Sequence, residues 1–300
     1  MGETRVDLLH LLEDLRDAYP GSLEETILTE IVANSLDSGA SRISFATDLA
    51  TATLTVLDNG RGMTRAELRR YHDLATSSKL RGRGIGFAGV GIKLGLLAYD
   101  SVLTESRSGD SHVATDWHLK SRHRAPWQWV DPPGLAHGLG TAVRLTVSNA
   151  LSELLDEGFI EGVLLRHFQP LFEPEFAALF ETHYPNGIQF VVNGRELARA
   201  SANEERIPIT IRLARKRRPA AAGYLFRSTV ALAEGERGIA IATRGKVIKR
   251  GWDWIGMTPA GADQIGGLID APALADCLTL NKADFLRTST VLSQGSSAHS

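Results

Sequence analysis

The chain has 300 residues, of which 43% are hydrophobic and 23% are charged, and its formal net charge is −2. This balance indicates a folded globular protein and excludes a polycation that coats DNA or anionic membranes without selectivity. The single cysteine, Cys277, excludes an internal disulfide, and neither a signal peptide nor a long apolar run is present. We therefore expect a cytoplasmic protein that does not contact membranes.

Two helices are predicted at the start of the chain. Residues 6–19 carry leucines at helical spacing, and Pro20 follows them. A second helix begins after Ser22, a predicted N-cap with Glu25 as its capping-box partner, and ends at Gly39.

Glu30 and Asn34 lie four residues apart on the second helix, so their side chains project from one face. A carboxylate in this position can orient or deprotonate a water molecule. An amide oxygen beside it can complete the oxygen shell of a magnesium ion that carries phosphates. Taken alone, the pair is more typical of a solvated helix face.

The next predicted elements are strands over 42–47 and 52–57, the second of which runs into Asp58-Asn59-Gly60-Arg61-Gly62-Met63. By itself this segment would indicate a hairpin turn. Residues 64–89 are predicted to form a polar helix and a stretch rich in glycine, serine and arginine, and residues 90–99 a glycine-led apolar helix. This order is typical of a mobile lid.

The lid contains Thr76-Ser-Ser-Lys79 and Gly84-Ile-Gly86-Phe-Ala-Gly89-Val-Gly91-Ile-Lys93. Glycine-rich backbone that enters a helix can direct amide N–H groups at phosphate, with Lys93 adding a positive charge. The glycine spacing also fits a dinucleotide fingerprint, but residues 77–83 before it are not a strand, so we reject that interpretation. The chain has no P-loop signature.

Further strands are predicted at 100–107, 112–120 and 141–147, after which a domain boundary is expected near Asn149. A helical pattern over 151–180, broken at Pro170 and Pro174, begins a second α+β unit. Its predicted strands are 188–192, 209–214, 223–232 and 239–248.

Two of these segments together resemble a known family. Glu30-Ile-Val-Ala-Asn34-Ser-Leu-Asp37-Ser-Gly39-Ala40 and the segment that begins at Asp58 look like the paired N-box and adenine-binding box of the gyrase, chaperone, histidine-kinase and MutL (GHKL) superfamily. The resemblance implies an α+β protein with a Bergerat-fold α/β sandwich ATPase domain over 1–149. A ribosomal S5-like transducer domain over 150–288 and a disordered tail over 289–300 would follow.

The resemblance also implies roles for individual residues. Glu30 would be the general base, Asn34 the magnesium ligand and Asp58 the acceptor for the adenine amino group, while the Thr141 hydroxyl would share the base edge. The other residues expected to bind ATP are Asp37, Gly60, Gly62, Met63, Ser77, Ser78, Lys79, Gly86, Phe87, Ala88, Gly89, Val90, Gly91, Ile92 and Lys93.

Lys282, in Leu278-Thr-Leu-Asn281-Lys282-Ala-Asp284-Phe285, resembles the lysine that the transducer domain of MutL and MORC-like proteins inserts against the γ-phosphate. We therefore expect Lys282 to take part in catalysis. A solvated surface lysine is an equally good interpretation of the residue by itself.

The leading functional hypothesis is a MORC- or MutL-like clamp with ATP and Mg²⁺ as cofactors, in which ATP closes the lid, drives homodimerisation and is hydrolysed slowly. A histidine kinase is disfavoured because no dimerisation hairpin with a phosphorylatable histidine precedes Glu30. The alternatives are a chaperone-like clamp on a protein client and a nucleotide switch that scarcely hydrolyses ATP.

DNA and a separate effector protein are candidate partners. A DNA contact would use a basic cluster in the segment where a predicted strand passes into a loop, although a solvated loop or a protein interface fits the cluster equally well. An effector is expected because the chain carries no nuclease or topoisomerase unit after the transducer domain. The basic cluster consists of Arg212, Arg215, Lys216, Arg217 and Arg218.

Overall fold

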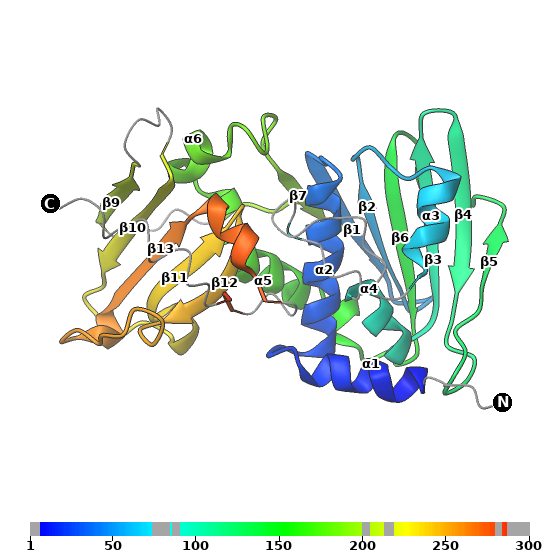
Figure 1. Ribbon diagram of the computed structural model, residues 1–300, viewed down its shortest axis with the longest axis horizontal. Coiled ribbons are helices and arrows are strands. Elements are labelled where there is room, and N and C mark those ends of the chain that lie inside the picture. Colours follow the sequence, from blue (N-terminus) through cyan, green and yellow to red (C-terminus); the bar gives the residue numbers. More distant parts are fainter. Residues whose placement is uncertain are drawn as a thin grey trace, which may run out of the picture.

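The computed structural model describes residues 7–73, 85, 91–199, 205–212, 219–279 and 284–286. Figure 1 shows two β-sheets side by side along the long axis, with helices α2 and α5 between them. This arrangement confirms the predicted α+β class. None of the helices in the described part of the chain combines the length and apolar character needed to cross a bilayer.

The larger sheet has eight strands in the order β5-β4-β3-β6-β2-β1-β7-β8. Neighbouring strands are antiparallel except β1 and β7, which are parallel. The strands are β1 (Arg42–Asp48), β2 (Thr53–Asp58), β3 (Tyr99–Ser108), β4 (Ser111–Trp117), β5 (Trp127–Val130), β6 (Gly140–Val147), β7 (Gln189–Val192) and β8 (Arg195–Glu196).

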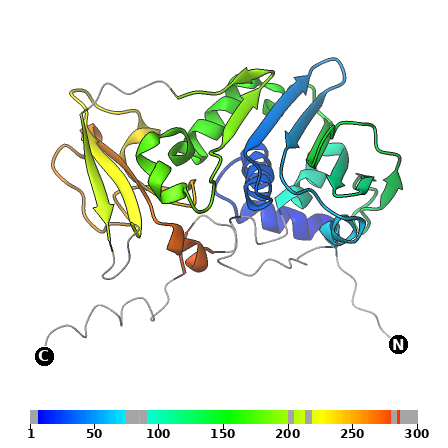
Figure 2. The same ribbon diagram turned by 90° about the horizontal axis from the view of Figure 1, so that it is seen from above.

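Helices cover one face of this sheet, as seen from above in Figure 2. They are α1 (Leu8–Asp17), α2 (Leu23–Asp37), α3 (Arg65–Tyr71), α4 (Gly91–Leu94), η1 (Gly95–Leu97), η2 (Glu153–Leu155) and α5 (Glu157–His167).

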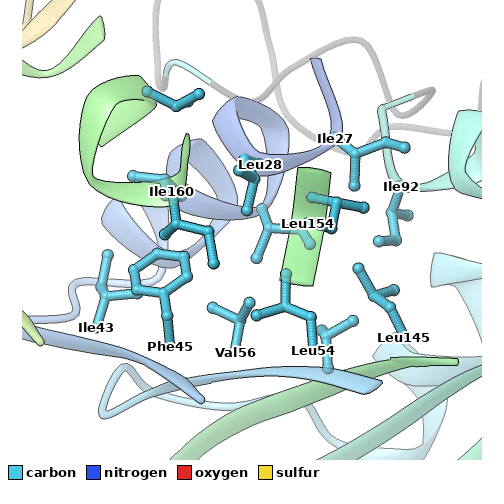
Figure 3. Close-up of a cluster of buried hydrophobic side chains, with 14 of the residues drawn as sticks. Ile27, Leu28, Ile43, Phe45, Leu54, Val56, Ile92, Leu145, Leu154 and Ile160 are labelled. Carbon is cyan, nitrogen blue, oxygen red and sulfur yellow. The ribbon is translucent and has the colours of Figure 1, made fainter. Parts of the chain in front are cut away.

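The main hydrophobic core lies between these helices and the sheet. Strand residues alternate in burial, so Phe45 and Val56 point toward α2 and are almost fully buried. Figure 3 shows Ile27 and Leu28 of α2 and Ile160 of α5 packed above them. The core therefore fixes α2 over the centre of the sheet.

The larger sheet continues beyond the boundary expected near residue 149. Strand β7 pairs with β1, and the chain reaches it through α5, which packs in the same core. The strand predicted at 188–192 is therefore present, but it belongs to the first sheet. Strands β5 and β8 were not predicted, because two to four residues give too short a periodic signal.

The second sheet has five strands in the order β12-β11-β13-β10-β9. They are β9 (Arg206–Ile211), β10 (Ala221–Arg227), β11 (Gly238–Thr243), β12 (Lys246–Gly251) and β13 (Ile265–Asp270). The short helices of this part are η3 (Gln169–Phe172), η4 (Pro174–Phe176), α6 (Ala177–Phe180), η5 (Glu234–Glu236), η6 (Ala262–Gln264) and η7 (Pro272–Cys277).

The prediction for the second sheet was wrong at two strands. A single strand was expected over 239–248, whereas Arg244 and Gly245 form a turn between β11 and β12. Strand β13 was not predicted because Gly266 and Gly267 interrupt its apolar pattern. These glycines are needed in the sheet, since added Cβ atoms would lie 2.4 Å and 2.6 Å from the side chains of Phe226 and Leu225.

The start of α2 is built partly as expected. The Ser22 hydroxyl accepts a hydrogen bond from Glu25 N at 3.2 Å, which confirms the N-cap. The predicted capping box is wrong, because the Glu25 carboxylate instead accepts hydrogen bonds from Arg166, at 2.7 Å, and His167 of α5. These bonds lower the pKa of Glu25 to about 2. These hydrogen bonds to Glu25 therefore hold α5 against the beginning of α2.

We predict that Glu25→Gln destabilises the protein by about 1–3 kcal/mol at neutral pH, because the hydrogen bonds to a charged acceptor are lost. The folded-state pKa lies below the ordinary value of 4.5. The stabilisation is therefore complete above about pH 4.5 and is lost as the pH falls toward 2. Urea unfolding between pH 7 and pH 3 should show the two proteins converging in stability under acid.

The control is Glu13→Gln, which changes an exposed carboxylate of α1 next to His10. It should alter stability little, since exposed ion pairs contribute little. An equal loss of stability in Glu13→Gln and Glu25→Gln would contradict the role assigned to Glu25.

Candidate functional site

One row of the buried sheet face is polar. Asp58 of β2 pairs with Thr141 of β6, and Thr141 pairs with Ser106 of β3. The row beside it contains the apolar residues Val56 and Val143, which belong to the core. The core therefore ends in a line of hydrogen-bonding groups near the C-terminal half of α2.

The Asp58 carboxylate is buried, with 7% of the residue exposed. Its Oδ2 accepts a hydrogen bond from Ser35 Oγ at 2.9 Å, and its Oδ1 accepts from Gly60 N at 2.9 Å and Thr141 N at 3.2 Å. Burial raises the pKa of Asp58, while these three donors oppose the shift. The carboxylate is thus held in one orientation.

Ser106 joins three segments at the same place. Its Oγ accepts from Met63 N at 2.7 Å, lies 3.2 Å from Gly140 O, and lies 3.0 Å from Thr141 Oγ1. Neither Ser106 nor Ser35 was among the site residues predicted from the sequence. The alternation of β3 could have indicated Ser106, because it shares the buried face with Thr104 and Val102.

A pocket opens between this polar row and α2. Its walls combine apolar and polar side chains, which is the usual composition of a small-molecule site. The lining residues are Ile31, Asn34, Ser35, Asp37, Ser38, Val56, Asp58, Arg61, Gly62, Met63, Tyr71, Thr141 and Val143. The structure thus brings together Asn34, Asp37, Asp58, Gly62, Met63 and Thr141 from the predicted site.

Three glycines around the pocket are required by contacts within the protein. An added Cβ would lie 1.8 Å from Ser38 Oγ at Gly60, 2.1 Å from Arg107 O at Gly62 and 1.9 Å from Asp58 O at Gly140. Gly62 and Gly140 also have positive φ angles of 66° and 138°. Gly60 and Gly62 are among the residues expected to bind ATP. The structure shows that they allow close packing of the pocket itself.

Glu30 lies one turn before Asn34 on α2 and is 3% exposed. Its Oε1 is 3.8 Å from Nζ of Lys246, the first residue of β12. Asn34 and Asp37 are half-buried, and Asp37 Oδ1 accepts a hydrogen bond from Ile85 N at 2.8 Å. The helix therefore carries a buried carboxylate and two more accessible polar side chains along one side.

Only part of the predicted phosphate-binding segment falls within the described residues. Gly91 begins α4, and Ile92 is buried in the main core rather than in the pocket wall. Lys93 is also buried, and its ammonium group donates a hydrogen bond to Asp73 O. Burial lowers the pKa of Lys93 to about 8.

The remaining residues expected to contact phosphate lie outside the described part of the chain, and so does the predicted sensor Lys282. The residues of the phosphate segment concerned are Ser77, Ser78, Lys79, Gly86, Phe87, Ala88, Gly89 and Val90.

Within the described residues, no group of three or more histidine, cysteine, aspartate or glutamate side chains could hold a metal ion. A preformed cage is not needed for Mg²⁺, which usually keeps several waters and binds through substrate phosphates and one or two protein oxygens. The amide oxygen of Asn34, at the pocket wall, fits such a contact. The donor set thus suits magnesium that arrives with a phosphorylated ligand.

We predict that Gly62→Ala destabilises the protein more than Gly109→Ala. Both glycines have positive φ, 66° and 55°, so each substitution strains the backbone by about 1–2 kcal/mol. Only at Gly62 does the new methyl group meet backbone, whereas the space beside Gly109 is open. Denaturant unfolding of both variants measures the difference. Equal losses of stability would contradict the close contact between Gly62 and Arg107.

One family of known proteins matches part of the chain. Residues 22–133, which include Glu30, Asn34 and Asp58, match the family described as Histidine kinase-, DNA gyrase B-, and HSP90-like ATPase. The chain has no significant match among curated proteins. This match identifies residues 22–133 as similar to the ATPase domains of the GHKL superfamily.

Proposed function

We propose that this protein is a magnesium-dependent ATPase whose Asp58 recognises adenine and whose Glu30 activates water. The observation that carries the proposal is the buried, oriented Asp58 carboxylate at the end of an apolar pocket, beside Thr141 and below α2.

Adenine would lie between the apolar walls with its exocyclic amine toward Asp58. A buried acceptor discriminates strongly, because a base without the amine leaves the carboxylate without that hydrogen bond. Three donors from the protein fix the direction of the carboxylate. The Thr141 hydroxyl, 3.0 Å from Ser106 Oγ, would serve the adjacent atom of the base edge.

The phosphates would extend from this pocket along α2. Asn34 would contribute an oxygen ligand to Mg²⁺. A bound Mg²⁺ would neutralise part of the phosphate charge. One turn earlier, Glu30 would accept a proton from the water that attacks the γ-phosphate. The lid residues around Lys93, together with Lys282, would complete the phosphate site.

We predict different defects for two substitutions. Glu30→Gln should bind ATP but hydrolyse it at least about 100-fold more slowly, because the general base is lost. Asp58→Asn should weaken ATP binding roughly 5- to 150-fold, which corresponds to a lost or mismatched buried hydrogen bond of about 1–3 kcal/mol. Equilibrium binding and single-turnover phosphate release with Mg²⁺ separate the two effects.

Asp48→Asn is the matched control for Asp58→Asn, because Asp48 is an exposed carboxylate at the end of β1 in the same sheet. Its ATP affinity should equal that of the wild type. The adenine assignment would be wrong if Asp58→Asn bound ATP as tightly as Asp48→Asn. The ATPase proposal would be wrong if the wild type neither bound nor hydrolysed ATP.

The proposal extends to an ATP-gated clamp of MORC- or MutL-like kind, in which the second sheet acts as the transducer unit. The close approach of this sheet to Glu30 supports such coupling. Of the basic cluster proposed to contact DNA, Arg212 is exposed after β9 and the other four residues lie outside the described part of the chain.

We predict that a non-hydrolysable ATP analogue converts the protein from monomer to dimer, as measured by light scattering after gel filtration. Glu30→Gln should dimerise with ATP itself and remain dimeric. If DNA is the client, it should bind the dimer with an affinity that falls steeply with added salt. If unfolded polypeptide but not DNA stimulated ATP hydrolysis, a chaperone-like clamp would be favoured. A protein that stayed monomeric in every nucleotide state would contradict gated dimerisation.

A further inference from the structure

An ion pair joins the second sheet to the helix that carries the candidate general base. Nζ of Lys246 lies 3.8 Å from Oε1 of Glu30, and the two side chains are 7% and 3% exposed. Little water can therefore screen the two charges from each other. Because Lys246 belongs to β12 and Glu30 to α2, the pair forms only while the second sheet is docked against α2.

The turn that precedes Lys246 is tied to the next strand of its own sheet. Arg244 and Gly245 both have positive φ angles, 50° and 84°, as a two-residue hairpin turn requires. The buried carboxylate of Asp270, at the end of β13, accepts hydrogen bonds from Arg244 N at 3.1 Å and Gly245 N at 2.7 Å. Asp270 thus fixes the turn by its backbone.

Two further contacts hold the other side of this turn. The Tyr184 hydroxyl donates a hydrogen bond to Arg244 O at 2.9 Å. The Leu171 side chain packs so closely that a Cβ on Gly245 would lie 2.4 Å from it. Lys246 is therefore presented to Glu30 by a supported turn rather than by a loose loop.

The ion pair with Lys246 affects the role proposed for Glu30 as the general base. A buried carboxylate is costly without a counter-charge, and a general base must be held within hydrogen-bonding reach of its water. An ammonium group fixed on a rigid element meets both requirements, because supporting contacts determine how well a catalytic group is oriented.

We propose that Lys246 is a positioning residue for Glu30: it supplies the counter-charge and holds the carboxylate in its working orientation while the second sheet is docked. This role rests on the proposed ATPase function. It differs from the role expected of Lys282, because Lys246 acts on the protein's own carboxylate and not on the γ-phosphate. Docking of the second sheet would thereby control hydrolysis more than ATP binding.

The first test is Lys246→Met in the full chain, with steady-state hydrolysis and equilibrium binding of Mg²⁺-ATP. The expected result is a kcat lowered about ten- to hundredfold with nearly unchanged ATP affinity, and partial recovery of kcat in Lys246→Arg. Lys249→Met is the matched control, since Lys249 lies on the same strand and pairs with the exposed Asp284 at 3.2 Å. It should hydrolyse ATP like the wild type.

The proposal is overturned if Lys246→Met leaves kcat unchanged or raises it, or if Lys249→Met lowers kcat equally. A second test does not depend on activity. Lys246→Met should lower the Tm by several degrees in the wild-type background but much less in the Glu30→Gln background, where the carboxylate charge that Lys246 compensates is already absent. Equal Tm shifts in the wild-type and Glu30→Gln backgrounds would also overturn the proposal. If the wild type hydrolyses no ATP, the ATPase proposal fails, while this thermal comparison still tests the pair.

Discussion

Burying the Asp58 carboxylate against an apolar core requires hydrogen-bond donors, and much of the site is built from the groups that supply them. Ser35 brings the C-terminal half of α2 to the sheet, Gly60 N fixes the turn after β2, and Thr141 N fixes the start of β6. The glycines at 60 and 140 follow from the same requirement, because side chains there would separate these segments. A single acceptor therefore organises three parts of the chain around the pocket.

Helix α2 links this pocket to the later part of the chain. Near its start, Glu25 is bound by Arg166 and His167 of α5, and in its middle Glu30 is paired with Lys246 of β12. One face of the helix lies over the sheet and its core, while these carboxylates meet elements that follow residue 149. A shift of the second sheet would thus reach Glu30 before it reached the part of the pocket around Asp58. This separation suits a protein in which binding and turnover are regulated separately.

Much of the fold could be predicted from the sequence, because local patterns carry the signal. The alternating strand that ends at Asp58 and the capped helix with Glu30 and Asn34 are strongly periodic, and the structure contains both. The prediction was wrong where the signal is short or interrupted, as in β5, β8 and the glycine-containing β13. The position of β7 could not be predicted either, because pairing with β1 is a contact between distant segments.

The sequence alone determined the chemical types at the site and their local order: a carboxylate and an amide one helical turn apart, an aspartate at the end of a strand, and glycines after it. Only the tertiary structure decided that Thr141 lies opposite Asp58, that Ser35 and Ser106 complete the polar row, and that Lys246 meets Glu30. The physical reason is that helical and strand periodicity arise from neighbouring residues. Strand pairing and buried ion pairs depend instead on which distant segments the whole core brings together.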